Sequence, residues 1–249
     1  MASTADGREL TRAHQAQQLR IATAVTAEVR ALWARLDVDD LDGSTPYWLA
    51  TTSTVVDRRT LESERVAGAY LSEYRFAEIG ARGEPVLRAP TSAALALQLA
   101  GPVRVKQLIS AGMDPEQAYR AARTKFEGVA SRQALMGGRL TIAATSQRDR
   151  RSIGWRRVTD GNPCAFCAML ASRGPVYRDA STAEGLKYHA HCGCTAEPMY
   201  TEWEPTEAEQ RYIDAYTNAR YTARQKSVKD VVRDMRRNGG FRDSPTTRR

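Results

Sequence analysis

Residues 160–167 read Asp-Gly-Asn-Pro-Cys-Ala-Phe-Cys, and residues 189–194 read His-Ala-His-Cys-Gly-Cys. These two stretches hold all four cysteines and two of the three histidines of the 249-residue chain. A Cys-x-x-Cys turn brings two thiolates to one ion, and a Cys/His pair on a second loop can complete a tetrahedron. Zinc accepts such mixed sulfur and nitrogen ligands, so the spacing predicts a compact metal-binding module.

Six residues compete for four ligand positions, and five of them form the predicted ligand set: Cys164, Cys167, His189, Cys192 and Cys194. His189 and Cys192 make the most natural second pair, with Cys194 as the main alternative. The sixth residue, His191, could instead point to solvent. A closed site with four protein ligands makes the zinc structural, because catalysis needs an open coordination position.

Other interpretations of the cysteines stay open at this point. Two disulfides would use all four thiols, but a chain folded in a cytosol disfavours stable disulfides. A redox-active Cys-x-x-Cys normally follows a strand and opens a helix in a βαβ unit, a pattern that the sequence does not have. Four unliganded thiols gathered by chance is the remaining alternative.

The first half of the chain has the periodicity of helices. Apolar residues recur every three or four positions over 8–36, which predicts an amphipathic helix. Thr45-Pro46 is typical of a cap and first turn, so a second long helix is expected over 46–79, with a break allowed within 51–60. Its buried side is predicted to include Leu61, Val66, Ala69, Tyr70 and Tyr74.

Glycines and prolines divide the next part of the chain. Residues 80–90 predict a loop, and Gly101-Pro102 separates two short helices. Asp114-Pro115 is a strong start signal for a helix that reaches about residue 150, in which Gly137-Gly138 is expected to be a weak point.

The predicted fold class is mainly α: long amphipathic helices, a small irregular α+β module held by zinc, and a basic C-terminal helix. Three domains follow from the changes in composition: a helical domain over 1–150, the Cys/His module over 151–203, and a basic amphipathic helix with a flexible tail over 204–249. Within the module, Gly174–Arg178 is a predicted short strand.

The formal net charge of +8 is concentrated at the C-terminal end. From Arg220 to Arg249 there are ten Lys or Arg residues and three Asp residues, a net charge of +7. Such a segment suits nucleic acid or an acidic protein face, or is simply solvated. The predicted contact residues are Arg233, Arg236, Arg237, Arg242, Arg248 and Arg249.

A second basic cluster precedes the cysteines. It comprises Arg148, Arg150, Arg151, Arg156 and Arg157, with Trp155 among them. Nucleic-acid contact is one interpretation. A solvated helix end is the other, and it is slightly favoured because arginines suit the negative pole of the helix dipole.

The start of the chain has no basic and apolar leader, and no apolar run approaches the roughly 20 residues that cross a bilayer. These features predict folding in a cytosol and no membrane partner.

The cysteine and histidine stretches resemble the Mu F-like minor head protein family of tailed bacteriophages, whose members carry Asp-x-x-x-Cys-x-x-Cys and then His-Pro-x-Cys-x-Cys. Here Asp160 opens the first segment and His189 the second, with Ala190 where the family usually has proline. Residues 155–200 are most similar to versions from phages of actinobacteria, as is the neighbourhood of residues 33–40. The specific match covers about a fifth of the chain.

The resemblance implies a minor capsid protein that acts in head morphogenesis. Its expected partners are the portal protein, the major capsid protein and packaged DNA. Its expected location is the capsid interior or portal vertex of the virion, assembled in the host bacterial cytoplasm. A capsid maturation protease is the first alternative, and a zinc-containing DNA-binding protein is the second.

An enzyme is the less favoured interpretation, because the sequence has no convincing catalytic set. His-Glu-x-x-His and Gly-rich phosphate loops are absent from the sequence. A serine or cysteine protease would need His189 or His191, which lie among the cysteines, or His14, which lies on a predicted helix.

Overall fold

The computed structural model describes residues 2–178, 187–222 and 227–241 and is mainly helical, as predicted. The elements in chain order are α1 (Ala5–Trp33), α2 (Leu41–Ile79), α3 (Ala94–Ala100), α4 (Pro102–Ser110), α5 (Pro115–Arg148), β1 (Gly154–Val158), α6 (Ala165–Ala171), β2 (Thr195–Met199), α7 (Glu207–Thr222) and α8 (Val228–Asn238). Among the described residues, every helix is too short or too polar to cross a membrane.

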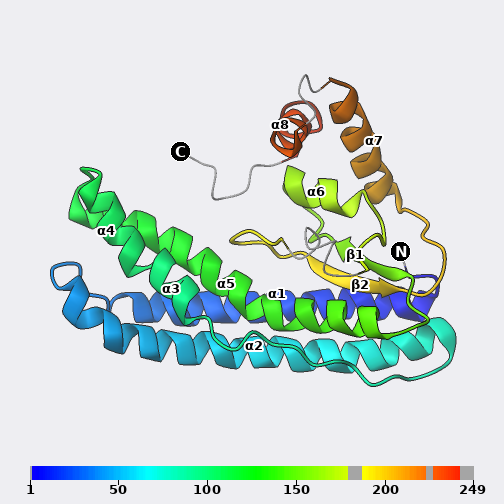
Figure 1. Ribbon diagram of the computed structural model, residues 1–249, viewed down its shortest axis with the longest axis horizontal. Helices are drawn as coiled ribbons and strands as arrows, with labels where there is room; N and C mark the ends of the chain where they lie inside the picture. Colours follow the sequence, from blue (N-terminus) through cyan, green and yellow to red (C-terminus); the bar gives the residue numbers. More distant parts are fainter. Residues whose placement is uncertain (1, 179–186, 223–226, 242–249) are drawn as a thin grey trace.

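Helices α1, α2 and α5 lie side by side as a long bundle (Figure 1), with α3 and α4 at one end and the small sheet against the other. Strands β1 and β2 pair antiparallel, with Gly154 opposite Met199 and Val158 opposite Thr195. Helices α6, α7 and α8 lie on the far side of the sheet from the bundle (Figure 1). The sheet therefore separates the bundle from the last helices of the chain.

The hydrophobic core has two main parts. At the α3–α4 end, Trp33, Trp48 and Phe126 are buried and contact one another in edge-to-face and tilted arrangements, with ring centroids 5.0–5.8 Å apart. At the sheet end, Tyr70 and Tyr74 of α2 share a core with side chains from the sheet and from α6, α7 and α8. Each of these aromatic side chains buries more apolar area than a smaller side chain can.

Helix α2 begins earlier than the sequence predicted. Asp40 is its N-cap and accepts a hydrogen bond from the amide of Gly43 at 2.9 Å. Pro46 therefore lies inside the helix rather than at its start, and the helix continues through the β-branched residues 51–60. A capping aspartate within reach of an unpaired amide outweighed the weaker Thr-Pro signal.

The buried side of α2 was also partly mispredicted. Leu61 is 50% exposed and Ala69 is exposed, whereas Tyr70 and Tyr74 are buried as predicted. The interior is occupied instead by polar residues such as Ser63, which donates to Gln18 Oε1 at 2.6 Å. Hydrogen-bonded polar side chains can replace apolar ones inside a bundle, and apolar periodicity does not reveal them.

The predicted weak point of α5 was wrong, because the helix runs unbroken from Pro115 to Arg148. A Cβ at Gly137 would overlap the carbonyl oxygen of Thr60, and one at Gly138 would lie 2.9 Å from Ser63 Oγ. The two glycines therefore permit α2 and α5 to approach closely. Close packing of backbones is a use of glycine that a helix propensity does not capture.

The start of α5 and the separation of two short helices were predicted correctly. Asp114 caps α5 by accepting from the amide of Gln117 at 3.0 Å, and Gly101 separates α3 from α4. The predicted strand over 174–178 is reduced to a single bridge between Tyr177 and Trp155. The segment predicted to form one basic helix is divided into α7 and α8. Helix α7 carries three acidic and two basic residues, so it is not the basic helix that was predicted.

Candidate metal centre

The five predicted ligands come together at the junction of α5, α6 and the loop that leads into β2. Cys164 is the N-cap of α6 and Cys167 lies in its first turn, whereas the other three residues lie on the loop. All four cysteines are at least 96% buried and none is in a disulfide. Side chains that are 20–30 residues apart in the sequence therefore form one compact cluster of metal-ligand atoms.

The distances around Cys167 are close to those expected around a metal ion. Cys167 Sγ lies 3.6 Å from Cys192 Sγ and 3.6 Å from His189 Nε2, and Cys164 Sγ lies 2.9 Å from His189 Nε2. Thiolates about 2.3 Å from a tetrahedral zinc are about 3.8 Å from one another. The spacing around Cys167 is close to this value.

Two overlapping groups of donor atoms can be distinguished. Cys164, Cys167 and His189 form one group, and Cys167, Cys192 and Cys194 form the other. Within each group, all donor atoms lie within 4.8 Å of one another. Cys167 belongs to both, so it is the residue on which any four-ligand set depends most.

Hydrogen bonding fixes the tautomer of His189. Its Nδ1 lies 2.6 Å from the carbonyl oxygen of Ala190, so Nδ1 carries the proton and donates it. With a metal bound, a neutral ring of this tautomer would offer the lone pair of Nε2, and Nε2 faces the sulfurs of Cys164 and Cys167. This is the arrangement that a metal-bound histidine normally has.

His191 points away from the cluster, and it packs on α5 rather than pointing to solvent. Its backbone has a positive φ of 60°, which turns the side chain toward the helix. There Nε2 donates to the carbonyl oxygen of Thr124 at 2.9 Å, and the ring lies on Gly128, where any Cβ would overlap it. The sequence analysis missed this role of Gly128, although a glycine inside an otherwise helical stretch was a signal.

Two buried arginines accompany the cysteines, and the sequence analysis missed the role of both. Arg139 of α5 is 2% exposed and donates to the carbonyl oxygens of Cys192 (2.6 Å) and Cys194 (2.8 and 3.1 Å). Arg157 of β1 is 0% exposed, and its Nη1 lies 3.7 Å from Cys167 Sγ. Near Arg139, small and apolar residues occupy every side of α5. That pattern could have indicated that this part of the helix is buried all round, Arg139 included.

The surroundings shift the acidities of the thiols. Hydrogen bonds that the Cys164 thiolate accepts from Cys167 and from His189 lower the pKa of the Cys164 thiol to about 4. Hydrogen bonds from Cys167 and Cys194, together with the charges of Arg139 and Arg157, lower the pKa of the Cys192 thiol. Hydrogen bonds from the neighbouring cysteines raise the pKa of the Cys167 thiol, and the hydrogen bond with Cys192 raises that of Cys194. Without a metal, two of the four thiols therefore favour the thiolate, which is the form that binds metal.

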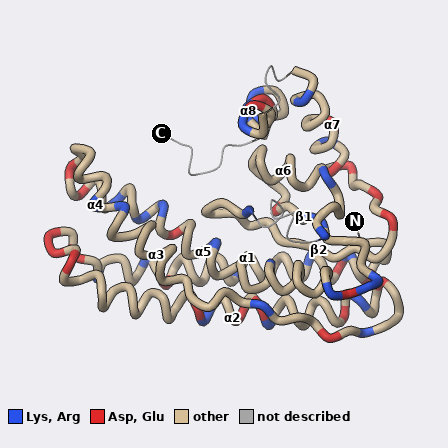
Figure 2. Tube along the Cα trace, in the orientation of Figure 1, with Lys and Arg blue, Asp and Glu red and all other residues tan. Residues whose placement is uncertain are grey.

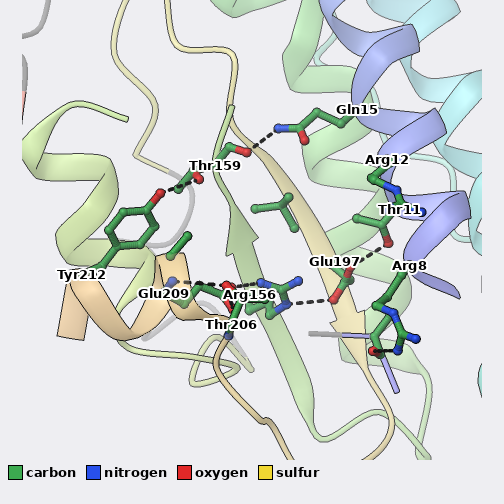
Figure 3. Close-up of a pocket in the computed structure, with 13 residues that line it drawn as sticks. Arg8, Thr11, Arg12, Gln15, Arg156, Thr159, Glu197, Thr206, Glu209 and Tyr212 are labelled. Carbon is green, nitrogen blue, oxygen red and sulfur yellow. Dashed lines mark hydrogen bonds and ion pairs between the residues drawn. The ribbon is translucent and has the colours of Figure 1, made fainter. Parts of the chain in front are cut away.

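A separate network of buried charges joins the bundle, the sheet and α7 (Figure 3). Arg156 donates from Nε to Glu197 at 2.7 Å and from Nη1 to Glu209, and Glu197 also accepts from Thr11 at 2.6 Å. Glu209 accepts from the amide and hydroxyl of Thr206, which closes a capping box at the start of α7. A cavity of about 200 Å³ adjoins this network.

This network corrects the nucleic-acid interpretation of the second basic cluster. Arg156, Arg157 and Trp155 are at least 95% buried, whereas Arg148, Arg150 and Arg151 are exposed. A buried guanidinium that is paired with protein groups cannot contact phosphates. Nucleic-acid contact or a solvated helix end therefore remains an interpretation only for the three exposed arginines.

The predicted acidic-partner residues divide into two groups. Arg233, Arg236 and Arg237 lie on α8, whose other side buries Val231, Val232 and Met235. Arg233 is ion-paired with Asp230, and Figure 2 shows both basic and acidic residues on α8. The remaining three, Arg242, Arg248 and Arg249, and the predicted flexible tail from residue 242 onward, lie outside the described residues.

Comparison with known proteins identifies the family. The model of a family described as VG15 protein matches residues 1–223, which include the bundle, the cluster and α7. The chain is also similar to the Gene 15 protein of Mycobacterium phage D29, with 26% identity over 163 residues. This alignment covers 51% of the chain and 59% of the relative. No solved structure matches. The match over most of its length shows that the chain belongs to the VG15 protein family, a family of bacteriophage proteins.

Proposed function

We propose that this protein is a minor capsid protein that acts in phage head morphogenesis, associated with the portal vertex or the capsid interior. The observation that carries the proposal is the family match over residues 1–223, together with a relative from a mycobacterial phage. The Asp160, cysteine and histidine pattern, similar to that of Mu F-like minor head proteins, supports the more specific assignment to the head.

Particles made by the phage that encodes the chain provide the test. We expect quantitative mass spectrometry of purified virions to detect the chain at few copies per particle, and crosslinking to join it to the portal or major capsid protein. A chain that is abundant in the lysate but absent from purified heads and virions would contradict the proposal. Cleavage of the major capsid protein by the purified chain would instead support the maturation protease.

We further propose that the cysteine cluster holds one structural zinc ion. Four buried cysteines and the half-buried His189, in two overlapping groups, support this assignment, as does the direction of His189 Nε2 toward two of the sulfurs. Protein ligands would close the coordination shell and leave no open position for catalysis. When bound, the zinc would supply the stability that a small irregular module cannot obtain from its own core.

A metal assay combined with a thiol count tests the zinc centre. We expect one zinc per chain and four thiols that become reactive only after a chelator is added. A purified protein without metal and with four freely reactive thiols would contradict the centre.

The exposed side of α8 is the proposed contact for packaged DNA or an acidic capsid lining. Arg237 is exposed, and Arg233 is 56% exposed despite its ion pair with Asp230. Phosphate contacts release counterions, so DNA affinity must fall steeply as salt rises. We expect the double variant Arg233→Gln/Arg237→Gln to weaken DNA binding and flatten its salt dependence. Binding that hardly changes with salt in the unmodified protein would count against DNA as the partner.

A further inference from the structure

Arg139 and Arg157 enclose the ring of Tyr188 from two different elements. The guanidinium carbon of Arg139, from α5, lies 3.8 Å from the ring centroid, and that of Arg157, from β1, lies 3.9 Å from it. All three side chains are at least 97% buried. Cation–π contacts are stronger between desolvated groups than at an exposed site, so the two guanidinium groups and the ring hold one another in place beside the cysteine cluster.

The same two arginines hold the loop that carries three of the five metal-ligand residues. Arg139 donates three hydrogen bonds to the carbonyl oxygens of Cys192 and Cys194. Arg157 donates to the carbonyl oxygen of Lys187 at 3.0 Å. The loop is therefore fixed at both of its ends by guanidinium groups that cannot lose their charge.

The positive charges of the two arginines can also balance the negative charge of a zinc–thiolate centre. A zinc ion with three thiolates and a neutral imidazole is formally anionic, and one with four thiolates is more so. A net charge inside a protein is costly unless opposite charges lie nearby. Arg139 and Arg157 are two such charges, and Arg157 Nη1 lies 3.7 Å from the sulfur of Cys167, which both donor groups share.

We propose that Arg139, Tyr188 and Arg157 form a charge-balancing clamp that stabilises the thiolate-rich metal centre and ties it to α5. The inference rests on the proposed zinc centre and goes beyond it. Under this proposal, metal binding and attachment of the loop to the bundle are coupled, so that losing either one weakens the other. Both arginines act as positioning residues, since they contact the ligand residues and not the metal itself.

Arg139→Met tests the clamp, because methionine keeps much of the side-chain volume and removes the charge and the hydrogen bonds. We expect the zinc affinity of the full-length protein, measured by chelator competition, to fall about 10- to 100-fold, as is typical when an outer-shell partner is removed. Arg148→Met is the matched control, since Arg148 is an exposed arginine in the last turn of the same helix. Its zinc affinity should equal that of the unmodified protein.

Arg139→Lys separates charge from geometry and guards against a methionine variant that does not fold. Lysine retains the charge but lacks the planar fork, so its zinc affinity should lie between the two extremes. Hydrogen exchange gives a second readout: removing zinc from the unmodified protein should increase exchange in residues 187–194 and in the part of α5 that they contact.

The outcomes distinguish the clamp from the metal centre. If the unmodified protein binds no metal, the centre itself is overturned, and the clamp with it. If it binds zinc and both Arg139 variants bind with unchanged affinity, only the clamp is overturned. Zinc removal that leaves exchange in residues 187–194 and α5 unchanged would also contradict the coupling to the bundle.

Discussion

The helical bundle and the Cys/His module obtain their stability in different ways. The bundle buries large aromatic side chains, and Trp33, Trp48 and Phe126 contact one another at its α3–α4 end. The module consists of a two-stranded sheet, the seven-residue helix α6 and a loop, and its innermost side chains are four cysteines and Tyr188. Two buried charges accompany these side chains: Arg157 from the module's own strand β1, and Arg139 from α5 of the bundle.

The difference shows what each region needs in order to fold. Burial of apolar area scales with the size of a core, and three helices of 29 to 39 residues provide enough of it. A two-stranded sheet is marginal by itself, and a short helix adds little. We therefore expect the module to depend on the proposed zinc ion and on its contacts with the neighbouring helices, while the bundle depends on close packing between its own helices.

The largest expected effect comes from removing a metal ligand, which should destabilise the module and leave the bundle folded. Cys167→Ser removes the residue that both donor groups share. Because structural zinc contributes on the order of 10 kcal/mol of apparent folding free energy, we expect loss of zinc and fast hydrogen exchange across residues 154–171 and 187–199. The bundle helices should retain slow exchange and most of the helical circular dichroism signal.

His191→Ala is the control for that experiment. His191 packs on Gly128 and donates to Thr124, so its removal should leave one zinc per chain. Zinc retained in Cys167→Ser, or lost in His191→Ala, would contradict the assignment of the ligands.

A smaller effect is expected from the close contact inside the bundle. Gly137→Ala introduces a Cβ that overlaps the carbonyl oxygen of Thr60. Alanine favours a helix by about 1 kcal/mol over glycine, but forced overlap between two backbones typically costs about 1–3 kcal/mol. We expect a lower midpoint of denaturant unfolding.

Gln147→Ala, at an exposed position of the same helix, should change the free energy of unfolding by less than about 0.5 kcal/mol. A higher midpoint for Gly137→Ala would show that α2 and α5 can separate without cost, and would make the bundle less tightly packed than the structure indicates.

The smallest effect concerns a histidine within the bundle. Burial lowers the pKa of His14 from 6.5 to about 3, and its ring stacks on Tyr70 at 4.4 Å. The folded protein therefore keeps the ring neutral, whereas the unfolded chain binds a proton as the pH falls below about 6.5. Stability contributed by the neutral ring is present above that pH and is lost at about 1.4 kcal/mol per pH unit as the pH falls toward 3.

Denaturant unfolding at pH 6.0 and 5.0, with zinc held in excess, measures this slope. His14→Gln keeps a polar side chain that does not titrate, so its stability should fall less over the same interval. Equal slopes for the two proteins would show that His14 takes up a proton in the folded state.

The sequence alone determined where most helices lie and that the chain is mainly helical, and it predicted the candidate metal ligands that the structure brings together. These features depend on local signals: the spacing of cysteines, the capping aspartate Asp114, and the recurrence of apolar residues. The tertiary structure decided those features that depend on contacts between residues far apart in the sequence. It buried Arg156 and Arg157, which a linear charge pattern cannot distinguish from surface arginines, and it placed His191 on Gly128 instead of at the cluster.

The glycines of α5 also show that contacts between distant residues override local signals. Gly137 and Gly138 predict a weak helix when only their own conformational freedom is considered, but they support an unbroken helix where α2 lies against them. A residue's effect on the folded chain depends on the atoms that face it. Only the tertiary structure brings Thr60 to Gly137, and Arg139 to the carbonyl groups of Cys192 and Cys194.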